Sequence, residues 1–156
     1  MRFGPFCSIL MLLGSTSLLP GKLTQEQKQQ LPPPAAHPID FAREIKPILE
    51  SSCIKCHGRG RAKGDFRIDN RGTILKGGES GQAVVPGRSE DSYVIELVMG
   101  FDPDSRMPKK GSALTRDQVA LLRAWIDQEL PWSEGVTFER AEPMNLKPRR
   151  PELPAD

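Results

Sequence analysis

The stretch Cys53-Ile54-Lys55-Cys56-His57 is the most informative part of this 156-residue chain for predicting its fold and its bound group. Two thiols three residues apart on a turn of helix can add to the two vinyl groups along one edge of a haem. The adjacent imidazole of His57 can then ligate the iron from one side of the ring. The motif therefore predicts one covalently attached haem c, held by Cys53 and Cys56, with His57 as the proximal ligand of its iron.

Other interpretations of the two cysteines stay open. A thioredoxin-like redox pair belongs in a βαβ setting, which this sequence does not indicate. A structural zinc site takes four ligands, and the other histidine, His37, lies in a polar segment well before the motif. A simple disulfide between Cys53 and Cys56 would suit an exported protein.

The sixth iron position needs a donor, and the candidates are His37, Met99, Met107 and Met144. His37 and Met144 lie in polar segments outside the predicted helices. Met99 ends an amphipathic helix, where packing is the expected role of a methionine. Met107 lies in a loop between two predicted helices, and Pro108 stiffens that loop. Such a loop can cover the open face of the haem, so Met107 is the predicted distal ligand.

Composition divides the chain into one unit with flanking segments. Residues 1–21 have a basic start, an apolar stretch and small residues, which is the pattern of a signal peptide. If that signal were retained, it would anchor the chain in a membrane. Residues 22–37 are rich in Gln and Pro and are expected to form an extended linker. Residues 133–156 are charged and Pro-rich, and we expect an extended tail there.

The unit between these segments, residues 38–132, is predicted to be all-α with long loops. Asp40 is a suitable N-cap for its first helix. Phe41 and Ile45 share one face of that helix, and Pro47 should kink it or begin its second half. The helix then runs into the cysteine motif. No convincing strand pattern is present.

Three further helices are expected. The first covers residues 71–76, and the second covers residues 90–98 with Ser89 as its N-cap. The last begins at a capping box formed by Thr115 and Gln118. The expected apolar faces are Tyr93, Val94, Leu97 and Val98 in the second helix, and Val119, Leu122, Trp125, Ile126 and Leu130 in and after the last.

The overall composition explains why a prosthetic group would help this unit to fold. Only 37% of the residues are hydrophobic and 6% are aromatic, which is little for a self-sufficient core. Small domains with weak cores need disulfides, a metal or a large prosthetic group. The net charge of +2 gives no indication of nucleic acid or of a membrane surface as a partner.

Basic side chains nevertheless cluster around both segments that are predicted to hold the haem. The cluster consists of Lys55, Arg59, Arg61 and Lys63 around the cysteine motif, and of Arg106, Lys109 and Lys110 around Met107. Because the net charge is small, this would be a local patch. It predicts an acidic redox partner protein that docks at the haem edge.

Several further motifs follow the cysteine motif in a characteristic order. They are Gly64-Asp65-Phe66-Arg67-Ile68-Asp69, Gly77-Gly78, Val84-Val85-Pro86-Gly87, Met107-Pro108, Leu122…Trp125-Ile126 and Pro131-Trp132. In this order they resemble the planctomycete-type cytochrome c domain, a class I-like cytochrome c. The resemblance implies haem attachment at Cys53 and Cys56 with His57 and Met107 as iron ligands. It also implies that Phe41 and Trp125 pack where the first and last helices cross.

These expectations converge on an exported mono-haem c-type cytochrome, periplasmic or otherwise extracytoplasmic. It would be an electron carrier and not an enzyme, since His/Met ligation serves one-electron transfer. A haem enzyme subunit or gas-binding haem protein is the alternative if Met107 does not reach the iron. A secreted, haem-free adaptor braced by a Cys53–Cys56 disulfide is the third hypothesis.

Overall fold

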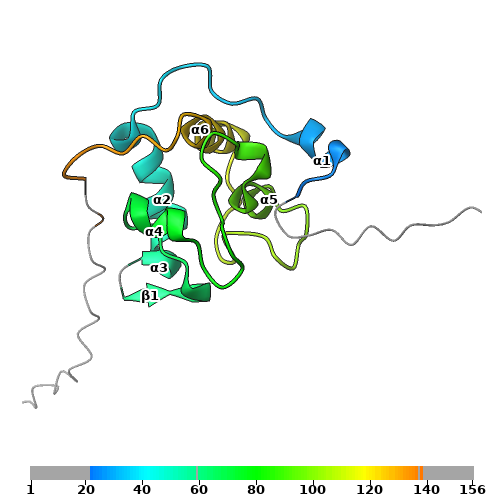
Figure 1. Ribbon diagram of the computed structural model, residues 1–156. Helices are drawn as coiled ribbons and strands as arrows, with labels where there is room; N and C mark the ends of the chain where they lie inside the picture. Colours follow the sequence, from blue (N-terminus) through cyan, green and yellow to red (C-terminus); the bar gives the residue numbers. More distant parts are fainter. Residues whose placement is uncertain (1–21, 59, 137, 139–156) are drawn as a thin grey trace, which may run out of the picture.

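The computed structural model of the protein describes residues 22–58, 60–136 and 138. This part of the chain is a set of short helices joined by long loops (Figure 1). The predicted signal peptide, residues 1–21, and most of the predicted tail, residues 133–156, lie outside the described residues. Among the helices that are described, none is long and apolar enough to cross a membrane.

The helical segment before the cysteine motif begins at Asp40, as predicted. The Asp40 carboxylate accepts a hydrogen bond from the backbone N–H of Arg43 at 3.1 Å. A π-helix, Phe41–Ile45, forms the first turn, and α2, Lys46–Ser52, continues from it. Pro47 lies at the start of α2, where its missing N–H costs no intrahelical hydrogen bond. The segment therefore changes helix type at the proline instead of breaking.

The loops after the cysteine motif contain only small elements. β1, Arg61–Ala62, forms a two-residue strand, and a 3₁₀ turn covers Lys63–Asp65. α4, Arg71–Lys76, covers the predicted residues and ends at Gly77, whose φ is 77°. A Cβ at Gly77 would lie 2.3 Å from the carbonyl oxygen of Gly81, so only glycine fits at this turn.

The next helix, α5, differs from the prediction at its start. It covers Tyr93–Met99, while Ser89–Asp91 forms a separate 3₁₀ turn. Ser89 was predicted to be a helix cap, and that is wrong. Its N–H and its hydroxyl both donate to the carboxylate of Asp127, at 2.7 and 2.9 Å. A tertiary hydrogen bond pair thus competes successfully with local capping.

The buried face of α5 is also rotated from the predicted one. Ile95, which the prediction omitted, is fully buried, and Val98 is buried beside it. Tyr93, Val94 and Leu97 are only half-buried. The helix therefore turns one apolar face to the core and keeps a second at the surface of the described chain.

The last helix, α6, Arg116–Asp127, is the best predicted element. Thr115 and Gln118 form the expected capping box, each side chain accepting the other residue's backbone N–H, at 3.2 and 2.9 Å. The whole predicted stripe of α6 and Leu130 is buried. The helix ends before Pro131, and the Arg71 guanidinium donates to the carbonyl oxygens of Glu129 and Leu130 beyond its end.

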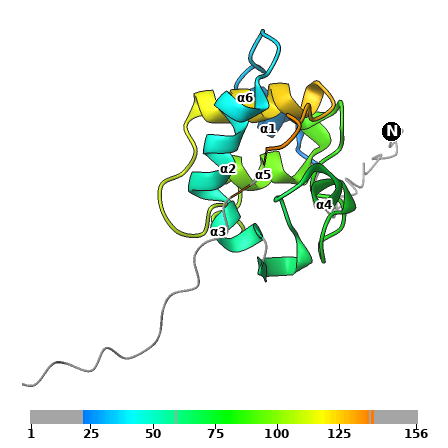
Figure 2. The same ribbon diagram turned by 90° about the vertical axis from the view of Figure 1, so that its left-hand side faces the viewer.

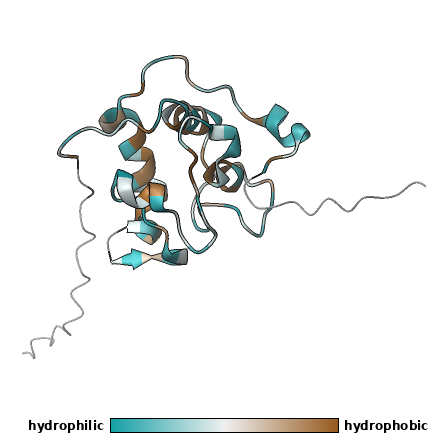
Figure 3. Ribbon diagram, viewed as in Figure 1, coloured by the Kyte–Doolittle hydropathy of each residue, from teal (hydrophilic) through white to brown (hydrophobic). Residues whose placement is uncertain are grey.

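These helices meet around one core. α6 passes across the end of the segment that contains α2, and α5 lies beside both (Figure 2). Hydrophobic residues gather on α2, α5 and α6, whereas the small helix α1 is hydrophilic (Figure 3). The Phe41 ring lies among those of Trp125 and Trp132, with centroid distances of 5.9 and 3.9 Å. The predicted contact between the first and last helices is therefore present.

Residues 22–37 differ from the extended linker that was expected. They contain α1, Gln25–Gln30, which begins at a capping box of Thr24 and Gln27. Leu23 and Leu31, on either side of α1, are buried. The polar composition of the segment concealed these two leucines, which is why the expectation of an extended linker was wrong.

Residues 22–35, here called the N-terminal strap, run along α6. The N–H of Ala35 donates to the carbonyl oxygen of Ala120 at 3.2 Å. The buried guanidinium of Arg123 donates to the carbonyl oxygen of Pro32 and to the hydroxyl of Ser89. Arg123 therefore joins the strap to the core of the domain.

Candidate functional site

The cysteine motif lies where α2 ends and the short helix α3, Ile54–His57, begins. The carbonyl oxygen of Cys53 accepts the N–H groups of Cys56 and His57 at 3.1 and 3.0 Å. This single turn brings together two thiols that are not joined to each other and one imidazole, all half-buried. One turn with two thiols followed by a histidine is the arrangement that covalent haem attachment requires.

The imidazole of His57 is oriented by the backbone of the next loop. Its Nδ1 lies 3.2 Å from the carbonyl oxygen of Phe66. Because a carbonyl oxygen only accepts, Nδ1 is the donor in this contact, and Nε2 is the ring nitrogen left for a metal. Metal-bound histidines usually donate their second ring nitrogen in this way, which fixes both tautomer and ring angle. His57 is thus suited to ligate iron through Nε2.

The chain around His57 is held closely on both sides. The N–H of Ile68 donates to the carbonyl oxygen of His57 at 2.8 Å, and the Phe66 ring meets the imidazole edge-on at a centroid distance of 5.5 Å. A Cβ on Gly58 would lie 2.6 Å from the carbonyl oxygen of Ile54. Glycine at position 58 therefore allows the chain to leave α3 and fold back over the imidazole.

The thiol of Cys53 lies in an apolar environment. Burial, with a smaller contribution from the neighbouring Cys56 thiol, raises the pKa of the Cys53 thiol to about 11. Cys53 is consequently a neutral thiol at neutral pH. A neutral, half-buried thiol suits contact with the apolar edge of a haem.

The predicted distal donors lie in very different places. Met107 is half-buried, and its N–H donates to the carbonyl oxygen of Leu97 on α5 at 2.9 Å. Met99 packs against the core, and the exposed His37 pairs with Glu44 at 2.7 Å. Met144 lies outside the described residues. Met107 therefore lies on a loop whose backbone is hydrogen-bonded to α5.

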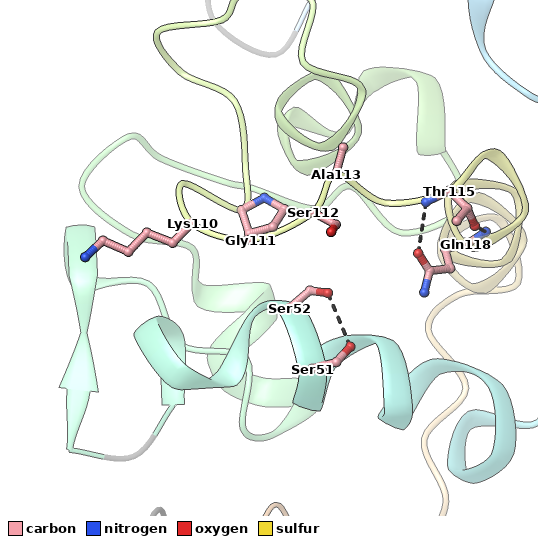
Figure 4. A pocket seen from close by; sticks show the side chains of 9 residues that line it. Ser51, Ser52, Lys110, Gly111, Ser112, Ala113, Thr115 and Gln118 are labelled. Atoms are coloured by element: carbon pink, nitrogen blue, oxygen red, sulfur yellow. Dashed lines mark hydrogen bonds between the residues drawn. The ribbon is translucent and has the colours of Figure 1, made fainter.

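A cavity of about 390 Å³ separates that loop from α2. Ser51 and Ser52, which directly precede Cys53, form one wall, and Pro108 with residues 110–113 forms the opposite wall (Figure 4). The helix that leads to the cysteine motif and the loop that carries Met107 therefore face each other across this space.

The predicted basic patch is mostly exposed. Lys55, Arg61, Lys63, Lys109 and Lys110 are exposed and Arg106 is half-buried, while Arg59 lies outside the described residues. Lys109 donates to the carbonyl oxygen of Asp104 in its own loop. No set of three or more His, Cys, Asp or Glu side chains within the described residues could hold a bare metal ion. A haem iron with one histidine and one thioether ligand needs no such set.

Some of these contacts could not be predicted from the sequence. The carbonyl oxygen of Phe66 orients His57, but a backbone acceptor leaves no trace in residue type. The only sequence feature that points to this contact is that Phe66 belongs to the motif Gly64-Asp65-Phe66-Arg67-Ile68-Asp69. The wall formed by Ser51 and Ser52 was missed because serines near a helix end are ordinary surface residues.

A helical domain with a Cys-x-x-Cys-His turn and an oriented histidine is typical of the class of c-type cytochromes. The family model for planctomycete cytochrome C matches residues 53–111, from the first cysteine of the motif to the loop after Met107. This match confirms the resemblance to the planctomycete-type cytochrome c domain over residues 53–111, and this family implies covalently bound haem. No curated protein and no solved structure matches the chain.

Proposed function

We propose that this protein is an exported mono-haem electron carrier, in which Cys53 and Cys56 attach the haem and His57 and Met107 ligate its iron. The contact between His57 Nδ1 and the carbonyl oxygen of Phe66 carries this proposal. It leaves Nε2 as the ring nitrogen that can ligate iron and fixes the plane of the ring. Bound haem c supplies a one-electron Fe(III)/Fe(II) couple.

The protein's own residues hold and orient the group. Cys53 and Cys56 attach it through two thioether bonds. The backbone contact with Leu97 holds Met107 beside α5, and its thioether is the proposed distal ligand. Ligation by histidine and methionine raises the reduction potential.

The proposed role is that of a carrier, and its partner is a second redox protein. The exposed lysines and arginines around the two haem-binding segments favour a partner with an acidic docking surface. Such a patch increases the rate of encounter more than it increases affinity. The periplasm or another extracytoplasmic space is the proposed location, because the first 21 residues have the pattern of an export signal.

Optical spectra of protein matured in a host that attaches haem c test this function. We expect haem that survives acid–acetone extraction, a low-spin spectrum and no change when carbon monoxide is added to the reduced protein. His57→Ala should abolish the normal low-spin spectrum. Phe66→Leu is the matched control and should retain it, because the carbonyl oxygen that faces His57 belongs to the backbone.

The same spectra decide between the hypotheses. Binding of carbon monoxide would indicate an open distal position and a haem enzyme subunit or gas-binding protein. Haem-free protein from a competent host would leave a secreted adaptor with a Cys53–Cys56 disulfide. A native low-spin spectrum in His57→Ala would show that another residue is the proximal ligand.

A further inference from the structure

The loop that orients His57 is joined to the far end of α6 by one side chain. The guanidinium of Arg71, the first residue of α4, donates to the carbonyl oxygen of Leu130 at 3.1 Å and to that of Glu129 at 2.9 Å. A guanidinium donates through a rigid fork, so two neighbouring carbonyl oxygens fix its direction as well as its position. Arg71 therefore connects the chain around His57 with the turn that follows α6.

The turn that accepts these hydrogen bonds has an unusual backbone. Glu129 and Leu130 have φ angles of 66° and 55°, a left-handed conformation that is strained for residues other than glycine. Such strain persists only where the surroundings fix the chain. The N–H of Leu130 donates to the carbonyl oxygen of Trp125 at 2.9 Å, the indole of Trp125 donates to that of Pro131, and Leu130 is fully buried. The turn is thus a firmly held anchor for Arg71.

The path from α4 back to His57 is short and hydrogen-bonded. Asp69, which directly precedes the N-cap of α4, accepts a hydrogen bond from the hydroxyl of Thr73 within that helix at 3.3 Å. The buried Ile68 donates its N–H to the carbonyl oxygen of His57 at 2.8 Å. The carbonyl oxygen of Phe66, two residues earlier, lies 3.2 Å from Nδ1 of His57. A displacement of α4 would therefore reach the imidazole through a few tied residues.

We propose that Arg71 is a positioning residue for the iron ligand His57, an inference that rests on the proposed function. By holding α4 against the turn after α6, Arg71 keeps the Phe66 carbonyl oxygen within hydrogen-bonding distance of Nδ1. A hydrogen bond from the second ring nitrogen makes a metal-bound imidazole a more basic ligand, hence a stronger electron donor. Stronger donation stabilises Fe(III) relative to Fe(II), so Arg71 lowers the reduction potential of the haem.

Arg71 has a second effect on the potential, and its sign is opposite. A positive charge near the iron disfavours Fe(III), so loss of the charge alone would lower the potential. Loss of positioning raises the potential, because the imidazole then donates less. Arg71 is exposed, so its charge is screened by solvent and salt, and we expect the loss of positioning to dominate.

The reduction potential of haem-loaded, full-length Arg71→Ala tests this inference. We expect a rise equivalent to about a threefold change in the ratio of reduced to oxidised iron, or roughly 30 mV at about 59 mV per tenfold. Amide hydrogen exchange at Ile68 should become several-fold faster, because the loop opens more often. Arg116→Ala is the matched control. Exposed Arg116 also donates to a backbone carbonyl oxygen, that of Gln30, and its loss should change neither value.

The double variant Arg71→Ala with Glu129→Gly separates positioning from stability. Glycine adopts the left-handed backbone at position 129 without strain, so it should restore part of any lost free energy of unfolding. It does not restore the link to α4, so the raised potential should persist. A potential that is unchanged or lower in Arg71→Ala, that rises equally in Arg116→Ala, or that returns to the parent value in the double variant would overturn the inference.

These outcomes are separate from those of the proposed function. A parent protein that lacks haem or binds carbon monoxide would contradict the proposed function itself. A parent protein with a His/Met spectrum, whose potential does not rise in Arg71→Ala, would retain that function and would show that Arg71 does not position His57.

Discussion

The indole of Trp125 and the phenyl ring of Phe41 lie with their centroids 5.9 Å apart and their planes inclined by 36°. Both side chains are buried, and the indole N–H donates to the carbonyl oxygen of Pro131 at 2.9 Å. This pair joins the first helical segment, which leads to the cysteine motif, to the last helix. The position of the motif within the domain depends on it.

Trp125→Ala should therefore lower the free energy of unfolding by about 3–5 kcal/mol, the usual cost of removing a buried aromatic side chain. Leu121→Ala is the control on the same helix, because Leu121 is only half-buried. Chemical denaturation of the haem-loaded protein measures both. Equal losses in the two variants would show that the aromatic pair has no special role in joining the helices.

Replacement of Met107 by alanine should remove the weak charge-transfer band of methionine-ligated ferric haem and should lower the reduction potential. The reason is that the thioether favours the reduced iron. Met99→Leu should change neither property, because Met99 packs against the core. If Met107→Ala kept the band and Met99→Leu lost it, the distal ligand would be Met99.

Electron transfer with an acidic partner should become slower as the salt concentration rises, because the patch acts over roughly 8–10 Å at physiological ionic strength. The double change Lys55→Glu with Lys63→Glu should slow it further at low salt. Both lysines are exposed, so the folded structure should be retained. Stopped-flow kinetics across a salt series is the measurement. A rate constant that responds neither to salt nor to the charge reversal would show that the patch is ordinary solvated surface without a role in docking.

Asp69 should give the protein a measurable acid sensitivity. Its carboxylate accepts hydrogen bonds from Arg67 at 3.1 and 2.5 Å and from Thr73 at 3.3 Å. Burial alone would raise the pKa of Asp69, but the hydrogen bonds and charge of Arg67 outweigh burial and leave the pKa below its ordinary value. A depressed pKa means that this stabilisation is present above the unfolded-state pKa of about 3.9 and is lost as pH falls through the folded-state value.

Asp69→Asn should accordingly lower the free energy of unfolding by about 1 kcal/mol near pH 7, after allowance for solvent screening. The variant should also lose stability less steeply than the parent below pH 4, roughly the ordinary carboxyl range. Asp65→Asn, at an exposed position, is the control. Unfolding curves at several pH values provide the comparison, and parallel pH profiles for Asp69→Asn and the parent would contradict the assignment.

Arg123→Ala should loosen the N-terminal strap. The change leaves the carbonyl oxygen of Pro32 and the hydroxyl of Ser89 without their buried donor. Trypsin should then cleave after Lys28 several-fold faster, since proteolysis of a locally opened segment follows the population of the open form. Arg116→Ala is the matched control, because exposed Arg116 makes a single 3.3 Å contact with the strap, at Gln30. Unchanged cleavage in Arg123→Ala would mean that the leucines alone hold the strap.

Local rules were sufficient where neighbouring residues determine the structure. Asp40 and Thr115 cap helices through side-chain contacts with residues three positions later, and the helix over residues 71–76 ends at a glycine with positive φ. Each of these helix ends is determined by a few consecutive residues, so it can be predicted from the local sequence alone. The cysteine motif is predictable for the same reason.

Local rules failed where distant residues compete. Ser89 has the composition of a helix cap, yet Asp127 binds both its N–H and its hydroxyl from another helix. Residues 22–37 have the composition of a linker, yet Leu23 and Leu31 are buried in a cluster that includes residues of α6. These outcomes depend on long-range packing, which periodicity and composition do not contain.

The strap also determines how the domain is oriented relative to whatever is joined to its beginning. α1 and the cysteine-bearing turn α3 lie at opposite ends of the domain (Figure 1). Arg123 and the buried Leu23 and Leu31 hold the N-terminal strap against the domain, so that the strap does not act as a flexible linker. A tether attached at Lys22 would thus hold the domain at the end opposite the cysteine motif and leave that motif directed outward.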